Sequence, residues 1–222
     1  MKTTTAAKPR LGTRGQPEES RAAILRAAVK EFAEHGVAGA RTDAIAHAAG
    51  VNKALLYYYF QDKETLYGAV LDQVFTGLRE RVFGALGSET TPREKILAYV
   101  CAYFDFLANN PLYPRLVQRE MMQAGQKQGH MEHLVNQYFR PIFNRLKEVL
   151  TEGIDKGEFR PVDPVHFIPS MIAMIVQYFA SAPVMQMMMR VNPLSPERIA
   201  ERRAAVIDFI STALFRAEGE RK

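Results

Sequence analysis

The stretch TDAIAHAAGVNKALLYYYF, residues 42–60, predicts two short helices joined by a tight turn. Thr42 is a suitable N-cap for the first helix, because its hydroxyl can accept a hydrogen bond from a free amide. Gly50 predicts the end of that helix, since glycine adopts the left-handed conformation without a steric penalty. Asn52 can then cap a second helix over residues 53–60.

The second helix has two chemically different faces. Leu56 and Phe60 lie four residues apart, so they share an apolar face that can pack on Ile45 and Val51. The other face carries cationic, small and hydroxyl-bearing side chains: Lys53, Ala54, Tyr57 and Tyr58. A core does not accommodate that combination. Two helices arranged in this way are typical of a helix-turn-helix, whose second helix enters the DNA major groove.

The same pattern predicts how the residues of the second helix would contact DNA. Lys53, Ala54 and Leu55 lie at its N-terminus, where side chains reach the base edges. The three consecutive tyrosines of residues 57–59 can donate their hydroxyls to phosphates. The alternative is that these tyrosines are half-buried aromatics of an ordinary amphipathic helix, but three in a row beside a capped helix favour DNA binding.

The run from Thr42 to Leu66 resembles the DNA-binding domain of the tetracycline-repressor family. The matching residues are Thr42, Ile45, Ala46, Ala49, Gly50, Val51, Leu56, Tyr57, Phe60, Lys63, Glu64 and Leu66. The resemblance extends in detail over about residues 18–78. It implies DNA contacts by Thr42, Asn52, Lys53, Ala54, Leu55, Tyr57, Tyr58, Tyr59 and Lys63. By the same resemblance Tyr57 and Lys63 would contact phosphates.

Two positions differ from the pattern of that family. Many members have glycine where this chain has Ala54, and threonine or a small residue where it has Leu55. Leu55 offers an apolar contact alone, for example to a thymine methyl. The operator sequence therefore cannot be transferred from a relative.

From Thr91 onward the chain is helical in period, and together with the resemblance this predicts an all-α protein of about nine helices. A three-helix, N-terminal helix-turn-helix DNA-binding domain would be joined by a long helix to a C-terminal helical ligand-binding and dimerisation domain. The expected segments are a flexible basic tail over 1–16, the DNA-binding domain with its connecting helix over 17–88, and the second domain over 89–222. Apolar residues at four-residue steps predict the connecting helix over 63–86.

Composition limits the class of protein. The 222 residues are 47% hydrophobic, which is enough for a sizeable core. The single Cys101 cannot form an intramolecular disulfide, and no apolar run approaches the roughly 18 residues of a membrane helix, so a cytoplasmic protein is expected. The net charge is +5, and residues 1–60 hold 9 basic against 5 acidic residues. This excess supports DNA binding by the N-terminal end.

A ligand pocket is predicted in the second domain, mainly from the resemblance. The candidate lining is aromatic, methionine-rich and partly polar: Tyr103, Phe104, Met121, Met122, Tyr138, Phe143, Met174, Gln177 and Tyr178. Methionine adapts to irregular apolar shapes, which suits such a pocket. The same spacing also fits plain core packing for each of these residues.

The last two predicted helices are apolar on more than one face, which suggests that a partner chain covers them. The candidate dimerisation residues are Ile168, Ile172, Val176, Val206, Ile210 and Leu214. In the resembled family the last two helices form a dimeric four-helix bundle. A twofold dimer would present two reading helices to a pseudo-palindromic operator.

No glycine-rich phosphate loop, nucleophile elbow or paired-carboxylate motif occurs, so we expect no enzyme, no cofactor and no metal. The leading interpretation is a ligand-responsive dimeric repressor. Its partners would be double-stranded operator DNA, a second copy of the chain and a small, largely apolar effector, with no membrane. The alternatives are a helical adaptor that binds another protein and an all-helical small-molecule enzyme.

Overall fold

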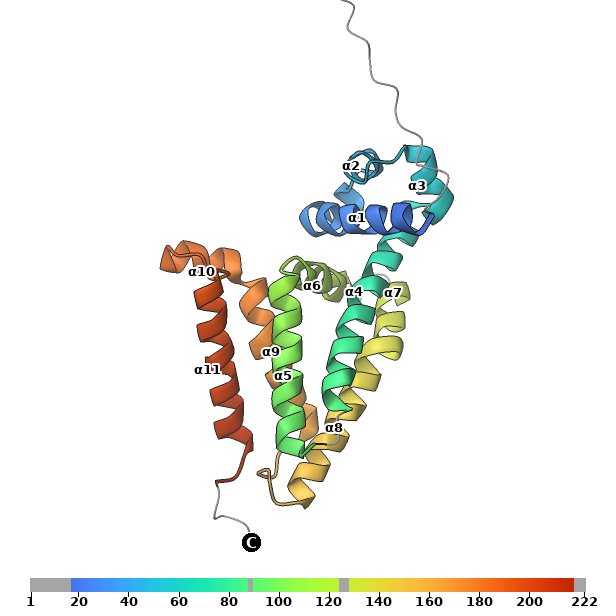
Figure 1. The fold of residues 1–222 in the computed structure, drawn as a ribbon. Helices are drawn as coiled ribbons and strands as arrows, with labels where there is room; N and C mark the ends of the chain where they lie inside the picture. Colours follow the sequence, from blue (N-terminus) through green and yellow to red (C-terminus); the bar gives the residue numbers. More distant parts are fainter. Residues whose placement is uncertain (1–16, 88–89, 124–127, 218–222) are drawn as a thin grey trace, which may run out of the picture. The chain divides into compact units, whose positions relative to one another are not determined.

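The computed structural model describes residues 17–87, 90–123 and 128–217, and the regular structure within these residues is helical apart from one isolated β-bridge. The chain divides into two compact units, Met1–Gln73 and Val74–Lys222. The division falls inside α4 (Lys63–Leu86), a single helix that begins in the first unit and ends in the second (Figure 1). The predicted boundary near residue 88 follows the end of α4 and lies outside the described residues.

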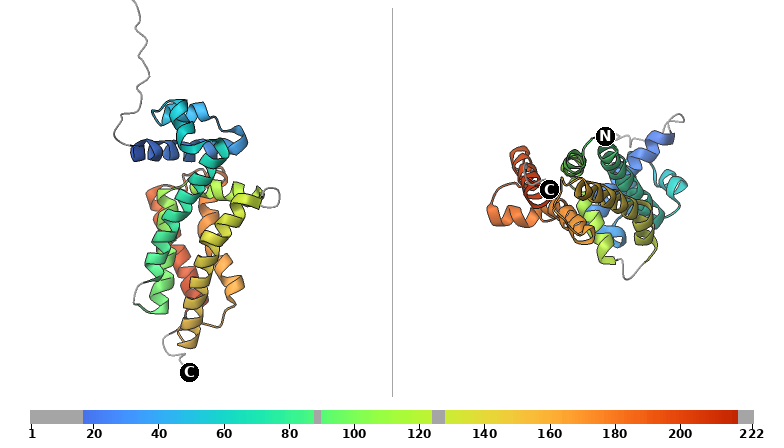
Figure 2. Two further views of the ribbon diagram at one scale, coloured as in Figure 1. Left: turned by 90° about the vertical axis from the view of Figure 1, so that its right-hand side faces the viewer. Right: turned by 90° about the horizontal axis from the view of Figure 1, so that it is seen from below.

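The first unit contains α1 (Pro17–Gly39), α2 (Thr42–Ala48), α3 (Lys53–Phe60) and the first half of α4 (Figure 2). Its core is the predicted one, because Ile45, Leu56 and Phe60 are buried. The ring of Phe32 on α1 packs edge-on against Tyr67 on α4, with centroids 5.1 Å apart. These contacts hold α3 with its opposite face exposed.

The turn between α2 and α3 forms largely as the sequence predicts. Gly50 has a φ of +69°, and the side chain of Asn52 accepts a 2.7 Å hydrogen bond from the Leu55 amide. The predicted capping role of Thr42 is wrong, because Arg41 occupies the N-cap position and Thr42 is the first helical residue. The Thr42 hydroxyl lies instead beside α3.

The second unit is a helical bundle that continues from α4. Its further helices are α5 (Pro92–Asn109), α6 (Tyr113–Gln123), α7 (Gln128–Leu134), α8 (Arg140–Asp155), α9 (Pro164–Ala180), α10 (Ala182–Met189) and α11 (Pro196–Leu214). Helix α5 is central, since it packs against α8, α9 and α11 (Figure 1).

Prolines shape the long helical segments of this unit. A π-helical turn, Val135–Phe139, joins α7 to α8 just before Pro141. Proline lacks an amide donor, so the local hydrogen-bond pattern must change near it. Helices α9 and α10 are bent by 63° relative to each other, and Pro183 lies in the first turn of α10.

Within the described residues, no single helix is both long enough and apolar enough to cross a membrane. The bent pair of α9 and α10 meets that test when the two are taken together, by length and composition alone.

A short clip fastens the end of α11 to the connection between α8 and α9. The Arg160 amide donates to the Leu214 carbonyl at 2.8 Å, and the Arg216 amide donates to the Glu158 carbonyl at 3.0 Å. The rings of Phe159 and Phe215 stack between these bonds, with centroids 5.5 Å apart. We refer to residues 158–160 and 214–216 as the terminal clip.

Candidate DNA-binding face and ligand cavity

Helix α3 presents the face that the sequence predicts for DNA. Lys53, Ala54, Tyr57 and Tyr58 are exposed, with Tyr58 at 79%. Leu55 and Tyr59 are half-buried at the flanks of this face. The exposed side of α3 therefore offers a cation, phenolic hydroxyls and a small residue, in the order expected of a recognition helix.

Two hydroxyls connect the start of α2 to the middle of α3. Thr42 Oγ1 and the Tyr57 phenolic oxygen lie 3.2 Å apart, so one donates to the other. The predicted DNA contacts Thr42 and Tyr57 are thus neighbours, although they are fifteen residues apart in sequence. The hydroxyl that accepts in this pair keeps its own proton and can donate it to a phosphate oxygen.

Lys53, the predicted base reader, is paired within the chain. Its ammonium lies 3.0 Å and 3.1 Å from the two carboxylate oxygens of Asp43 on α2. The hydrogen bond to Asp43 raises the pKa of Lys53, so the ammonium stays fully charged at neutral pH. Asp43 is absent from the set of DNA contacts that the sequence predicts, although its place in the first turn of α2 puts it next to Thr42.

Lys63 has a structural role in the first unit. Its ammonium donates to the carbonyls of Ala38 and Ala40, each at 3.2 Å. The Ala38 carbonyl lies in the last turn of α1 and the Ala40 carbonyl just after it, so no further turn of this helix can bond them. Lys63 therefore ties the start of α4 to the end of α1, and its predicted phosphate contact would have to use the remaining N–H.

The second unit contains an apolar cavity of about 450 Å³. Four of the predicted ligand residues line it: Tyr103, Met121, Phe143 and Gln177. Three residues of α9 predicted for dimerisation, Ile168, Ile172 and Val176, also line it. The sequence prediction omitted the rest of the wall, which is Phe75, Leu78, Val82, Tyr99, Val117, Gln118, Phe139, Ile142, Pro169 and Ala173.

The polar groups of the cavity are few and uncharged. They are the hydroxyls of Tyr99 and Tyr103 and the amides of Gln118 and Gln177, and no lining side chain carries a charge. Burial raises the pKa of both tyrosines, so both remain protonated at neutral pH. Among the described residues neither hydroxyl has a hydrogen-bond partner. Tyr99 lines the cavity, so a ligand there can supply a hydrogen-bond partner for its hydroxyl.

The other five predicted ligand residues lie outside the cavity wall. Phe104 packs against Phe179, and the Tyr178 hydroxyl donates to the Pro193 carbonyl at 2.5 Å. The Tyr138 hydroxyl lies 3.1 Å from Thr76 Oγ1 on α4. The remaining two are methionines: Met122 is 81% exposed, and Met174 is half-buried away from the cavity. Helical spacing alone could not separate these positions from the lining.

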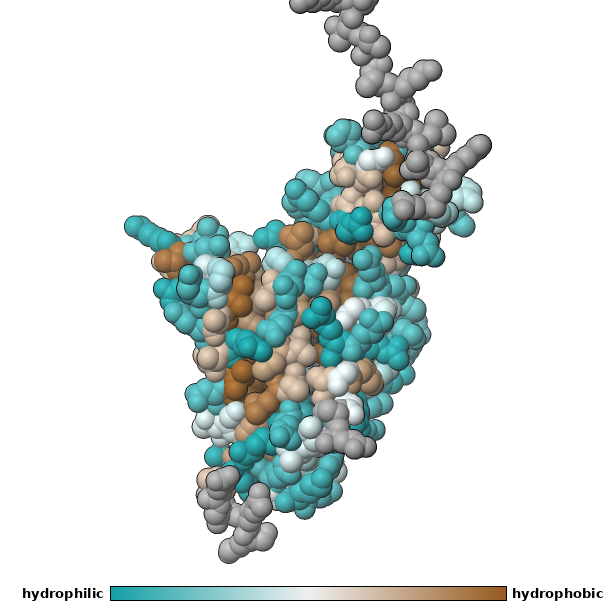
Figure 3. Space-filling model, in the orientation of Figure 1, coloured by the Kyte–Doolittle hydropathy of each residue, from teal (hydrophilic) through white to brown (hydrophobic). Residues whose placement is uncertain are grey.

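Most of the predicted dimerisation residues face inward. Ile168, Val206, Ile210 and Leu214 are buried against their own chain. Other faces of α10 and α11 carry apolar side chains that are exposed. Apolar surface is visible over these helices in Figure 3. The exposed side chains are Val184, Met187, Met188, Met189 and Phe209.

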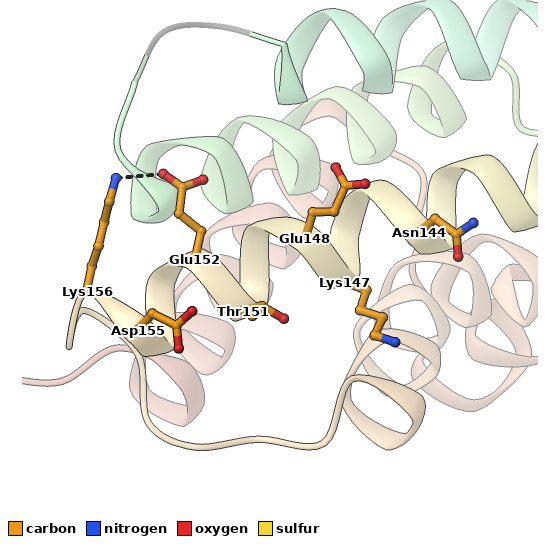
Figure 4. A pocket seen from close by; sticks show the side chains of 7 residues that line it. All are labelled: Asn144, Lys147, Glu148, Thr151, Glu152, Asp155 and Lys156. Carbon is orange, nitrogen blue, oxygen red and sulfur yellow. Dashed lines mark hydrogen bonds and ion pairs between the residues drawn. The ribbon is translucent and has the colours of Figure 1, made fainter.

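A polar groove follows one face of α8 (Figure 4). It is lined by Asn144, Lys147, Glu148, Thr151, Glu152, Asp155 and Lys156. Glu152 accepts hydrogen bonds from Lys156 at 2.6 Å and from the buried Lys95 of α5 at 3.3 Å. The Glu152 carboxylate therefore links α5 to α8. We interpret the groove as a solvent-exposed face of α8.

Comparison with known proteins identifies both units. Residues 24–70 match the family model described as bacterial regulatory proteins, tetR family, and residues 92–210 match a tetracyclin repressor-like C-terminal domain. The HTH-type transcriptional repressor SCO4008 of Streptomyces coelicolor is 30% identical over 176 residues, which cover 79% of this chain and 84% of the relative.

Two further proteins are similar over different extents. The HTH-type transcriptional activator FasR of Mycolicibacterium smegmatis is 38% identical over 108 residues, 49% of each chain. The crystal structure of the TetR family regulator PfmR from Thermus thermophilus has a TM-score of 0.70, covering 87% of this chain and 99% of that chain, at 23% identity. That likeness concerns the fold. With the helix-turn-helix and both family models in agreement, the chain belongs to the tetracycline-repressor family and is a DNA-binding transcriptional regulator.

Proposed function

We propose that this regulator is a cytoplasmic, dimeric, non-catalytic repressor that an uncharged, largely apolar effector releases from its operator. The observation that carries the proposal is the continuity of α4. This helix begins at Lys63, directly after the exposed face of α3, and contributes Phe75, Leu78 and Val82 to the cavity wall. An occupant that displaces the second half of α4 therefore also displaces its start.

Release by an effector requires a difference in affinity between the two states of the protein. In our proposal the empty cavity permits the α4 geometry that suits the spacing of two operator half-sites, and the occupied cavity favours another geometry. The repressor from Streptomyces coelicolor, which matches over most of both chains, supports repression rather than activation. Transcription of a reporter gene controlled by the operator distinguishes repression from activation.

For the dimer, we propose a contact through the outer faces of α10 and α11. Met187, Met188 and Phe209 are exposed there at 73%, 78% and 59%. Large apolar side chains grouped on a surface are typical of a protein–protein interface. The predicted residues Val206 and Ile210 would then support this face from within the unit and make no contact with the partner.

The first experiment is selection of an operator from random double-stranded DNA, followed by titration of the affinity against salt concentration. We expect specific binding in the nanomolar range that weakens steeply as salt rises. Tyr57→Phe should weaken DNA binding, since it removes a hydroxyl from the exposed face of α3. Tyr113→Phe in the second unit should leave DNA binding unchanged. Selection that enriches no sequence would contradict the proposal.

The effector class is tested with three bicyclic probes, naphthalene, 1-naphthol and 1-naphthoate, by calorimetric titration. We expect 1-naphthol to bind more tightly than naphthalene by about 1 kcal/mol, because its hydroxyl can bond with Tyr99 or Tyr103. The charged 1-naphthoate should bind most weakly, since no lining residue offers a counter-charge.

Removing the two hydroxyls with Tyr99→Phe and Tyr103→Phe together should abolish the preference for 1-naphthol. Tyr113→Phe is the matched control, because Tyr113 is a half-buried tyrosine of the same unit outside the cavity. A preference for 1-naphthol that survives in the double variant would show that the tyrosines are not the polar end of the site.

A further inference from the structure

The ion pair between Lys53 and Asp43 has an unusual position, because it lies on the surface that would contact DNA. Asp43 places a carboxylate beside Thr42 and within 3.0 Å of the Lys53 ammonium, among residues that would approach a polyanion. The side chains of both partners remain accessible, at 49% for Lys53 and 64% for Asp43. The ion pair is therefore exposed to solvent and is not part of the packed core.

This pairing changes what Lys53 can do on DNA. A free lysine at the start of a recognition helix binds any phosphate and so adds to affinity for every sequence. When a carboxylate lies 3.0 Å away, the two charges nearly cancel at the distance of a phosphate. The ammonium has three N–H groups, so at least one remains beside the contacts to Asp43 for a bond at close range, where direction and position matter.

The pair also has a geometry that a base pair can satisfy. An ammonium donor and a carboxylate acceptor stand side by side, one on α3 and the other on α2. In the major groove each base pair presents acceptors and an amino donor next to one another. Lysine donates to guanine or thymine oxygens, and a carboxylate accepts from the amino group of cytosine. A phosphate offers acceptors alone and repels the carboxylate.

We propose that Asp43 is a specificity-determining residue of this regulator: it makes Lys53 a reader of base edges and prevents it from acting as a general phosphate contact. The inference rests on the proposed DNA-binding function. It adds to that function a residue of α2 whose charge opposes binding to DNA of arbitrary sequence.

The test compares Asp43→Asn with the wild-type protein on the selected operator and on a scrambled duplex of equal length. Asp43→Asn frees the ammonium and keeps the shape of the side chain. We expect tighter binding to the scrambled duplex, a salt slope steeper by about 0.9 for one added phosphate contact, and about a tenfold loss of discrimination. The control Glu80→Gln removes the same charge from an exposed position on α4 in the second unit.

A second background separates the role of Lys53 from a general charge effect. In Lys53→Gln, the further change Asp43→Asn should alter neither the salt slope nor the discrimination, because no ammonium is left to release. Equal effects in both backgrounds, or a shift no larger than that of Glu80→Gln, would overturn the inference. If the wild-type protein itself does not discriminate between the two duplexes, the proposed function fails instead. Circular dichroism confirms that each variant is folded.

Discussion

Two glycines of the second unit should respond in opposite directions to the same substitution. Gly84 in α4 and Gly153 in α8 both lie near the C-terminal end of a helix. A Cβ added at Gly84 meets no atom within 4 Å. A Cβ added at Gly153 would lie 2.2 Å from Phe159 Cδ2, far inside van der Waals contact. We therefore predict that Gly84→Ala stabilises the unit and Gly153→Ala destabilises it.

The magnitudes follow from the surroundings of each site. Alanine in an unobstructed helix position is about 0.5–1 kcal/mol more favourable than glycine, mainly through chain entropy. At Gly153 that gain is opposed by overpacking, which costs about 1–3 kcal/mol. Phe159 has little freedom to move aside, because it is fully buried and stacked on Phe215, which itself lies under the Arg93 guanidinium at 4.5 Å.

The assay is urea unfolding of both full-length variants at one protein concentration, since dimerisation makes the apparent stability depend on concentration. The helix gain is common to both variants, so their free energies of unfolding should differ by the overpacking cost of about 1–3 kcal/mol, with Gly84→Ala above the wild type. Equal stabilities, or a stabilising Gly153→Ala, would refute the packing argument. Phe159→Leu in the Gly153→Ala background should recover part of the loss, because the smaller side chain makes room for the methyl group.

Three other predictions concern single interactions. Lys63→Met should lower the thermal midpoint of the first unit, because two carbonyls at the end of α1 lose their donor, while the salt slope of operator binding stays unchanged instead of falling by about 0.9. Asn52→Ala should cost about 1 kcal/mol and speed hydrogen exchange at the Leu55 amide, which loses its cap. Lys156, and after it Lys95, hold the pKa of Glu152 below its usual range, so the folded state binds this proton more weakly than the unfolded state does. The stabilisation is thus present above about pH 4.3, and it is lost as pH falls through the lowered pKa. Urea unfolding of wild type and Glu152→Gln measures it: the difference between their free energies of unfolding should shrink from about pH 6.5 to about pH 3.5.

The helix-turn-helix was predictable because its signals are local. A glycine with positive φ, an asparagine cap and two apolar residues four apart act within nineteen residues, and each forms as expected. Thr42 was misassigned for a related reason. A threonine before a helical run favours the N-cap position, whereas the actual boundary lies one residue earlier and the hydroxyl contacts Tyr57.

The cavity was only partly predictable, because its walls come from helices that are distant in sequence. Periodicity indicates that α9 is apolar on two sides, but it does not say which side faces the cavity and which faces a partner. Ile172 and Val176, which are predicted to contact a partner chain, also line the cavity, and their role in a dimer stays a prediction. Tyr99 had a usable signal: it lies four residues before Tyr103, on the same face of α5.

The Asp43–Lys53 pair was beyond sequence reasoning for a different reason. Ten residues separate the two side chains, and the turn between α2 and α3 decides whether they meet. A lysine at the start of a recognition helix suggests a DNA contact by itself. The interpretation of Lys53 changes only once its distance to the Asp43 carboxylate is known.

The terminal clip makes the last three helices a closed loop. The amides of Arg160 and Arg216, 56 positions apart, bond to carbonyls at the same place, so α9, α10 and α11 enter and leave the unit through one point. Closing a loop of that length costs chain entropy that local helix formation does not recover. These helices should consequently open as one cooperative element, in which the two clip amides exchange their hydrogens at the same rate. A chain cut before Phe215 would lose this closure, and with it the fixed placement of α11.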